Sequence, residues 1–179
     1  ENTSDFKVKV LSAGNSPNMP TTAQPKNSTV YSWPAILAGS KDGTMYLAEG
    51  GWSRMRRLDP GANGLVHVIS GNFPAWPAGI VVDGNQKVLV VTANGAFFQV
   101  VSNSLVKIGG NGLEVTVGDL NSAFFLSPHG MSIDAGGNLL VTDTDHNIVR
   151  KIEGLDLTPN KLYNPDKLAI LLASMNSLE

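Results

Sequence analysis

The chain has 179 residues, of which 42% are hydrophobic, and this is enough to bury a substantial core. Its net charge is -2, which argues against a nucleic-acid partner because phosphate binding needs a clustered positive field. The sequence has no cysteine, which excludes disulfides and thiolate metal sites, and no apolar run approaches the roughly 18 residues of a membrane-spanning helix. We therefore expect neither nucleic-acid binding nor insertion into a membrane.

The first predicted element is a strand over residues 6–11, within a segment that we delimit as residues 1–14. Residues 15–30 follow and are rich in Ser, Asn, Pro and Thr, a composition typical of an exposed connector with little capacity to build a core. The strand at 6–11 is therefore set apart from the rest of the chain. It is expected to belong to a unit that precedes the connector or to a partner chain.

The rest of the sequence repeats one pattern. Residues 34–59 align with residues 128–153 without a gap, and a further copy opens at Pro77. A unit that recurs every few tens of residues is typical of solenoids and propellers. We delimit the copies as residues 31–73, 74–118 and 119–177, and we expect residues 178–179 to be a remnant of cloning.

Within each copy the pattern predicts a meander of antiparallel strands. In the last copy, residues 130–134 and 139–142 are short apolar runs joined by the turn 135–138, whose two glycines allow positive φ. A second turn, 143–147, leads to a third strand at 148–152. We predict fourth strands at residues 64–70, 112–117 and 166–174, the last of which also permits a short helix.

Residues 123–143, continued by Asn147 and residues 150–152, resemble the NHL-repeat family. The other two copies are looser, since Ile36 stands where the family prefers Gly and Gln99 where it prefers Arg. The resemblance implies an all-β fold of β-propeller blades, each a four-stranded antiparallel meander. Propellers close with about four to eight blades, so three copies form an incomplete ring. Its completion requires the remaining blades of a longer parent chain or a second copy that makes a homodimer with six blades.

Charged residues recur at equivalent places across the second turn of two copies. Glu49 is followed by Arg56, and Asp143 is followed by Arg150. The gapless match assigns Thr92 and Gln99 to these places in the middle copy. Because a lone buried charge is costly, the joint loss of both charges predicts a cross-strand ion pair rather than a catalytic carboxylate.

Two patterns suggest a metal site, and neither is complete. Asp143, Asp145 and Asn147 place oxygen ligands at alternate positions, as a calcium loop does, but Ile148 and Gly154 stand where an EF-hand needs Gly and an acidic residue. A loop of side-chain to backbone hydrogen bonds is favoured over a weak ion site at these residues. The resemblance extends to propeller lyases at residues 128–130, but the matching positions of the other copies lack histidine. We expect no metal and no cofactor.

Strand polarity gives the best indication of a binding site. In an up-and-down meander, the connector that enters strand one and the turn between strands two and three lie at the same face of the propeller. This places five residues on one face: Trp33, Trp52, Trp76, His129 and His146. Aromatic side chains there can stack on a sugar or anchor a protein. The alternative is that each tryptophan beside a proline packs between neighbouring blades.

We therefore expect a non-catalytic module that binds a protein or carbohydrate ligand through this face. The alternatives are part of a propeller lyase or lactonase whose site is completed elsewhere, and a structural spacer. By resemblance to secreted bacterial repeat proteins, we expect an extracytoplasmic location, in the secreted fraction or the cell envelope.

Overall fold

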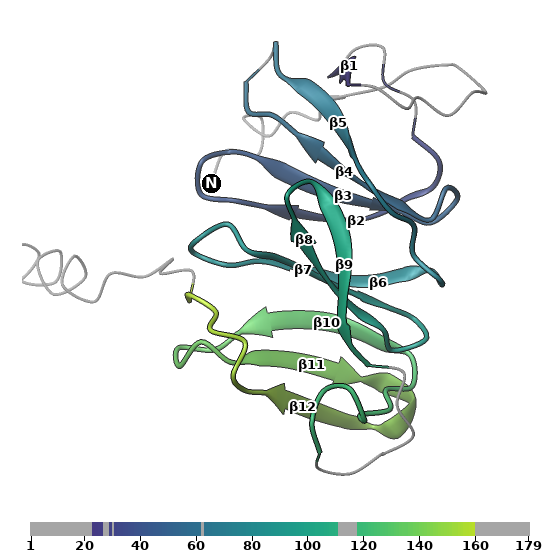
Figure 1. Cartoon of the computed structure of the whole chain (residues 1–179), viewed down its shortest axis with the longest axis vertical. Coiled ribbons are helices and arrows are strands. Elements are labelled where there is room, and N and C mark those ends of the chain that lie inside the picture. The colour runs from purple at the N-terminus through teal and green to yellow at the C-terminus, as the bar shows by residue number, and fades with distance from the viewer. Residues whose placement is uncertain (1–22, 27–28, 30, 62, 111–117, 160–179) are drawn as a thin grey trace, which may run out of the picture.

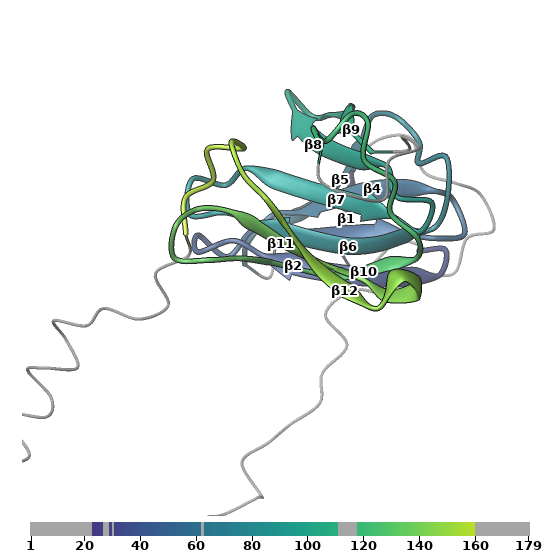
Figure 2. The same ribbon diagram turned by 90° about the horizontal axis from the view of Figure 1, so that it is seen from below.

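The computed structural model describes residues 23–26, 29, 31–61, 63–110 and 118–159. Within these residues the chain forms three sheets and no α-helix. Their first strands, β2 (Pro34–Gly39), β6 (Pro77–Val82) and β10 (Pro128–Ile133), are neighbours in space (Figure 1). Seen from below, the sheets lie one behind another (Figure 2). The fold is all-β, and the described blades form an arc rather than a closed ring.

Blade 1 is a sheet of five strands in the order β1-β5-β4-β3-β2. The remaining strands are β3 (Met45–Glu49), β4 (Arg54–Leu58), β5 (Leu65–Ile69) and β1 (Gln24–Pro25). β5 confirms the fourth strand predicted at residues 64–70. β1 lies in the segment predicted as an exposed connector, and there Gln24 and Pro25 pair with β5 while Pro25 remains exposed.

Blade 2 contains β6, β7 (Val88–Thr92), β8 (Phe97–Val101) and β9 (Ser104–Gly109) in sequential order. The fourth strand is β9, which pairs with β8, so the prediction of residues 112–117 as that strand is wrong. Ser102 and Asn103 link β8 to β9 with φ of 48° and 63°, the left-handed conformation that a two-residue hairpin turn requires. Residues 112–117 themselves lie outside the described residues.

Blade 3 contains β10, β11 (Leu139–Asp143) and β12 (Ile148–Ile152), with the short 3-10 helix η3 (Thr144–His146) in the second turn. The predicted turn at residues 135–138 is present, and Gly137 has a φ of 79°. The fourth strand predicted at 166–174 lies outside the described residues, as does the strand predicted at 6–11.

The cores lie between the blades because successive residues of each strand point to opposite faces. Tyr46 of β3 and Val90 of β7 belong to the core between blades 1 and 2. Leu89 of β7 and Val141 of β11 belong to the core between blades 2 and 3. Every residue of β7 is buried, as expected for a strand covered on both faces.

Strand register corrects one match made from the sequence. Arg56 lies opposite Leu47 in blade 1, and Arg150 lies opposite Val141 in blade 3. At the equivalent place in blade 2, Phe98 lies opposite Val90, whereas Gln99 lies opposite Leu89. The second turn of blade 2 is one residue shorter than the other two, so the gapless match fails beyond it. A buried phenylalanine, rather than Gln99, therefore replaces the arginine.

The part of the chain that the structure describes holds no helix of the length and apolar character that crossing a bilayer demands.

Candidate functional site

The structure gathers the chain segments that enter β2, β6 and β10 at the same edge as the second turns of the blades. Backbone hydrogen bonds join them: Gly50 donates to the Trp33 carbonyl at 3.0 Å and Ala93 to the Trp76 carbonyl at 2.8 Å. A second bond joins the same two segments in blades 1 and 3, from Gly51 to the Ser32 carbonyl at 3.1 Å and from Asp145 to the Leu126 carbonyl at 3.2 Å. We call this edge the contact face, defined by Trp33, Trp52, Trp76, Ser127, His129, Asp145 and His146.

Trp33 and Trp76 form an aromatic pair on the contact face. Their ring centroids are 5.7 Å apart, with an interplanar angle of 46°. Trp33 is 71% exposed and Trp76 is 44% exposed, so neither indole is buried between blades. The pair presents a tilted apolar surface that joins the first two blades.

Backbone conformation supports this exposed pair. Trp33 has a φ of 49°, a left-handed conformation that is costly for a bulky residue, of order 1–3 kcal/mol. Gly50 lies against the Trp76 ring, and a Cβ at this position would overlap the ring atoms. Trp76 therefore occupies space that is available only because residue 50 has no side chain.

Trp52 has a different environment. It is only partly exposed, and the guanidinium carbon of Arg56 lies 5.5 Å from the centroid of its ring. Arg56 is itself fully buried and donates from Nε to Glu49 Oε2 at 2.7 Å. Trp52 thus covers a buried ion pair, a structural role that sets it apart from the exposed pair.

The predicted cross-strand ion pairs are confirmed in both blades. Glu49 and Arg56 have completely buried side chains, and Glu49 Oε1 also accepts the Ser32 backbone N–H at 2.9 Å. In blade 3, Arg150 Nε lies 2.7 Å from Asp143 Oδ2, and Asp143 Oδ1 accepts the Leu126 N–H at 2.8 Å. Each carboxylate therefore ties its second turn to the segment that enters the blade.

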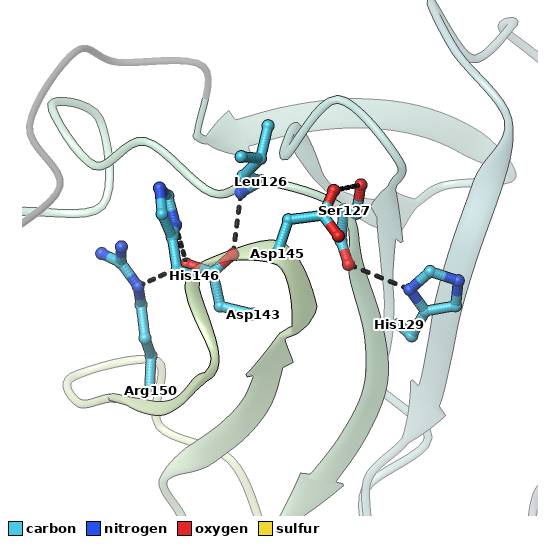
Figure 3. Close-up of polar contacts among 7 residues, drawn as sticks. All are labelled: Leu126, Ser127, His129, Asp143, Asp145, His146 and Arg150. Carbon is cyan, nitrogen blue, oxygen red and sulfur yellow. Dashed lines mark hydrogen bonds and ion pairs between the residues drawn. The ribbon is translucent and has the colours of Figure 1, made fainter.

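His146 contacts the carboxylate of the blade 3 ion pair, as Figure 3 shows. Its Nδ1 lies 2.8 Å from Asp143 Oδ2, and its ring packs edge-on against Phe124 with centroids 5.6 Å apart. Arg150 also lies over the Phe125 ring, 4.7 Å from the centroid. His146 is consequently held by structural contacts, with one ring nitrogen already engaged.

His129 is the exposed histidine of the contact face. Its Nδ1 lies 2.9 Å from the Ser127 carbonyl oxygen, while the Ser127 hydroxyl donates to Asp145 Oδ2 at 2.5 Å (Figure 3). The histidine therefore approaches the carbonyl rather than the hydroxyl of Ser127. This differs from a nucleophile and base pair, in which the histidine contacts the hydroxyl.

The residues considered for a weak ion site have other partners. Asp143 binds Leu126, His146 and Arg150, and Asp145 binds Ser127. Asn147 has a φ of 57° and closes the turn with a backbone bond to the Thr144 carbonyl at 3.0 Å. Within the described ranges, no group of three or more His, Asp or Glu side chains is placed to hold a metal ion.

Two residues that shape this face were not predicted from the sequence: Ser127, which belongs to it, and Gly50, which lies against the Trp76 ring. Ser127 immediately precedes the blade-opening Pro128, as Trp33 and Trp76 precede Pro34 and Pro77, so the repeat itself could have identified it. No sequence signal marks Gly50, because its importance arises from a contact with the next blade.

Comparison with known proteins identifies the repeat. Residues 125–152 match the NHL repeat. No curated protein matches the chain in sequence.

Solved structures with similar folds share little sequence with the chain. Virginiamycin B lyase from Staphylococcus aureus aligns with a TM-score of 0.50 at 13% identity, over 76% of this chain and 46% of that protein. A streptogramin B lyase aligns with a TM-score of 0.46 at 15% identity, over 69% and 42% of the two chains. An extracellular domain from B. thetaiotaomicron, assigned to a hybrid two-component system, aligns with a TM-score of 0.41 at 16% identity, over 72% and 19%.

The chain spans less than half the length of each of these proteins. At such identities the likeness concerns the fold and not the activity. The chain carries an NHL repeat at residues 125–152, and its described sheets have the fold of β-propeller blades.

Proposed function

We propose that the chain is a non-catalytic β-propeller module that binds a protein or carbohydrate ligand through its contact face. The observation that carries the proposal is the aromatic pair, two large indoles that touch each other and remain 71% and 44% exposed. Exposed aromatic residues of this kind are enriched among the residues that dominate binding energy. They offer a large contact area at little cost in side-chain entropy.

The rest of the contact face adds polar groups beside the aromatic pair. Asp145, His129 and Ser127 are partly or fully exposed at the same edge of blade 3. A surface that combines stacking indoles with hydrogen-bonding groups suits both a sugar ring and a protein loop. Trp52 and His146 support this surface through Arg56 and Asp143.

Both histidines use Nδ1 for contacts within blade 3: His146 with the Asp143 carboxylate, and His129 with the Ser127 carbonyl. These contacts fix the orientation of both rings at the contact face. Rings held in this way suit hydrogen bonding to a ligand.

Binding is tested by tryptophan fluorescence in titrations with neutral oligosaccharides and with purified cell-envelope proteins. For a true ligand we expect quenching, and we expect Trp76→Ala to weaken binding by about 2 kcal/mol or more, roughly 30-fold. Val106→Ala is the matched control, since Val106 is 44% exposed on β9, the outer strand of blade 2, and should leave affinity unchanged. Affinity that is indifferent to Trp33→Ala and Trp76→Ala would refute the assignment of the contact face.

The proposal includes a partner for the open ends of the arc, either a second copy of the chain or further blades of a longer parent protein. A sheet face that resembles a domain core is not normally left in water. The mass in solution separates the two: self-association gives a multiple of 18.9 kDa, whereas a monomer points to further blades. We also propose an extracytoplasmic location, which protease accessibility on intact cells would test.

A further inference from the structure

A cavity of about 190 Å³ lies between blades 1 and 2, at the opposite edge from the contact face. Blade 2 contributes Gln86 from the turn between β6 and β7, and Ser102 and Asn103 from the turn between β8 and β9. Blade 1 contributes Tyr46 of β3 and Arg57 of β4, which are neighbours in strand register. We call this cavity the interblade pocket.

The equivalent recess between blades 2 and 3 is filled by the chain itself. Three positions around the two recesses correspond in strand register and turn bonding: Tyr46 to Leu89, Val88 to Leu139, and Gln86 to Gly137. Leu157 is only 6% exposed and belongs to the same core as Leu89 and Leu139. Its carbonyl lies beside Gly137. Where these positions hold leucine and glycine, the fold therefore fills the recess with an apolar side chain.

Gln86 closes the interblade pocket to a segment placed like Leu157. A Cβ at Gly137 would overlap the Leu157 carbonyl oxygen, so that placement requires glycine. Gln86 carries a Cβ and keeps a φ of 65°, close to the 87° of Gly43 and the 79° of Gly137 in the other first turns. A left-handed backbone is costly for a residue with a side chain, and such strain is typical of functional sites. The strain at Gln86 places an amide group at the pocket.

The pocket combines an apolar part with a polar rim. The apolar part consists of Ile69, Val88 and Val100. Around it, Gln86, Ser102 and Asn103 are exposed, and Asn103 is held by a bond from Nδ2 to the Val68 carbonyl at 3.0 Å. Burial raises the pKa of Tyr46 above its ordinary value of 10.0, so this residue is neutral at neutral pH. Amide and hydroxyl groups both donate and accept hydrogen bonds.

The positive charge at the rim is offset. Arg57 is the cation, and its Nε lies 3.4 Å from Asp59 Oδ1. The Thr44 N–H, and to a smaller extent the Gln86 side chain, hold the pKa of Asp42 below its ordinary value of 3.8, so a second carboxylate lies beside the rim. Anion binding relies on a local excess of positive charge. The two carboxylates therefore favour a neutral ligand over an anion.

We propose that the interblade pocket binds one neutral sugar ring of the hexose class, at a site separate from the contact face. A pyranose carries apolar C–H groups on its ring faces and hydroxyl groups around its edge, which the apolar part and the polar rim of the pocket complement. The volume corresponds to about six water molecules at roughly 30 Å³ each, which suits a single ring.

The test uses the methyl glycosides of glucose, galactose and mannose, titrated into the isotope-labelled full chain and followed through its amide chemical shifts. We expect at least one glycoside to bind with a Kd of about 1 mM and to shift the amides of Gln86, Ser102 and Asn103. Gln86→Gly should weaken this binding at least about 10-fold, because it removes a side chain from the rim. Glycine adopts positive φ without strain, so the thermal midpoint should not fall and unfolding cannot explain the loss.

Asn85→Ala is the matched control. Asn85 adjoins Gln86 in the same turn, but its Nδ2 donates to Thr158 Oγ1 at 2.7 Å, so affinity should stay within about twofold. Binding that is lost in Trp76→Ala and kept in Gln86→Gly would put the sugar at the contact face, which overturns this proposal and supports the function proposed for that face. Displacement of the glycoside by acetate would reveal an anion site and overturn the proposal. So would the absence of binding by all three glycosides.

Discussion

Blades 1 and 3 share one local design in two different environments. Both tie the second turn to the start of the blade through a carboxylate that accepts a backbone N–H and faces an arginine on the third strand. In blade 1 both side chains of the pair are fully buried, whereas Arg150 in blade 3 is 12% exposed. The repeat therefore specifies the pair, and the surrounding strands decide how deeply it is buried.

The largest effect is expected from removing the blade 1 arginine. Arg56→Ala should lower the free energy of unfolding by about 3–5 kcal/mol, because it leaves the buried Glu49 carboxylate without its partner. Arg150→Ala should cost less, about 1–3 kcal/mol, because Asp143 keeps its contacts with His146 and the Leu126 N–H.

Urea denaturation measures both values. Arg57→Ala is the matched control, since Arg57 is 37% exposed beside Arg56, and it should change stability by less than about 0.5 kcal/mol. Equal losses for Arg56→Ala and Arg150→Ala would show that the difference in burial is energetically irrelevant. A loss below about 0.3 kcal/mol for Arg150→Ala would match an exposed pair and contradict the argument for blade 3.

The second comparison is between the stability losses caused by truncating Met55 and Val149, which are apolar residues at equivalent places in the third strands of blades 1 and 3. Met55→Ala should cost about 2–5 kcal/mol, because Met55 is completely buried and its truncation leaves a cavity. Val149→Ala should stay within about 0.5 kcal/mol if Val149 keeps its 68% exposure in solution. Thermal or urea unfolding distinguishes these values, and a large loss for Val149→Ala would mean that another segment covers β12.

The smallest expected effect is on the pH dependence of stability, and it concerns Asp134 in the first turn of blade 3. The Asn138 side chain, and then its backbone N–H, hold the pKa of Asp134 below its ordinary value of 3.8. When folding lowers the pKa of a carboxyl group, the group stabilises the folded state at any pH above its pKa in the unfolded chain. This stabilisation is lost as the pH falls through the pKa that the group has in the folded state. We therefore expect the stability advantage of the native chain over Asp134→Asn to shrink as pH falls below about 4.

This prediction is measured as urea midpoints from pH 6 to pH 2. Ser40→Ala is the control, because Ser40 is the equivalent residue of blade 1 and carries no titratable group. A constant difference between the native chain and Asp134→Asn over this range would contradict the assigned pKa shift.

The sequence predicted what local patterns encode. The strands of blade 3, the turn at Gly137 and both ion pairs are in the structure because alternation, turn glycines and paired charges are local signals. The fourth strand of blade 2 was placed wrongly, because Ser102 and Asn103 make a tight turn without the glycine that normally marks one. Gln99 was matched in place of Phe98 because a turn that is one residue shorter shifts the register.

The candidate site was predictable only in part. Strand polarity predicted that Trp33 and Trp76 lie at the same face, but not that their rings touch, since this depends on the left-handed backbone of Trp33. Trp52 and His146 share the face but contact Arg56 and Asp143 instead. Their orientation arises from packing between strands, which sequence spacing does not encode.

Gly50 has a consequence for how the aromatic pair can be modified. The Trp76 ring is confined between the backbone at Gly50 and the Trp33 ring, which limits the rotamers open to it. Any side chain introduced at residue 50 displaces this ring while both tryptophans stay unchanged. Position 50 is therefore a site from which the geometry of the aromatic pair can be altered remotely, by evolution or by directed mutagenesis.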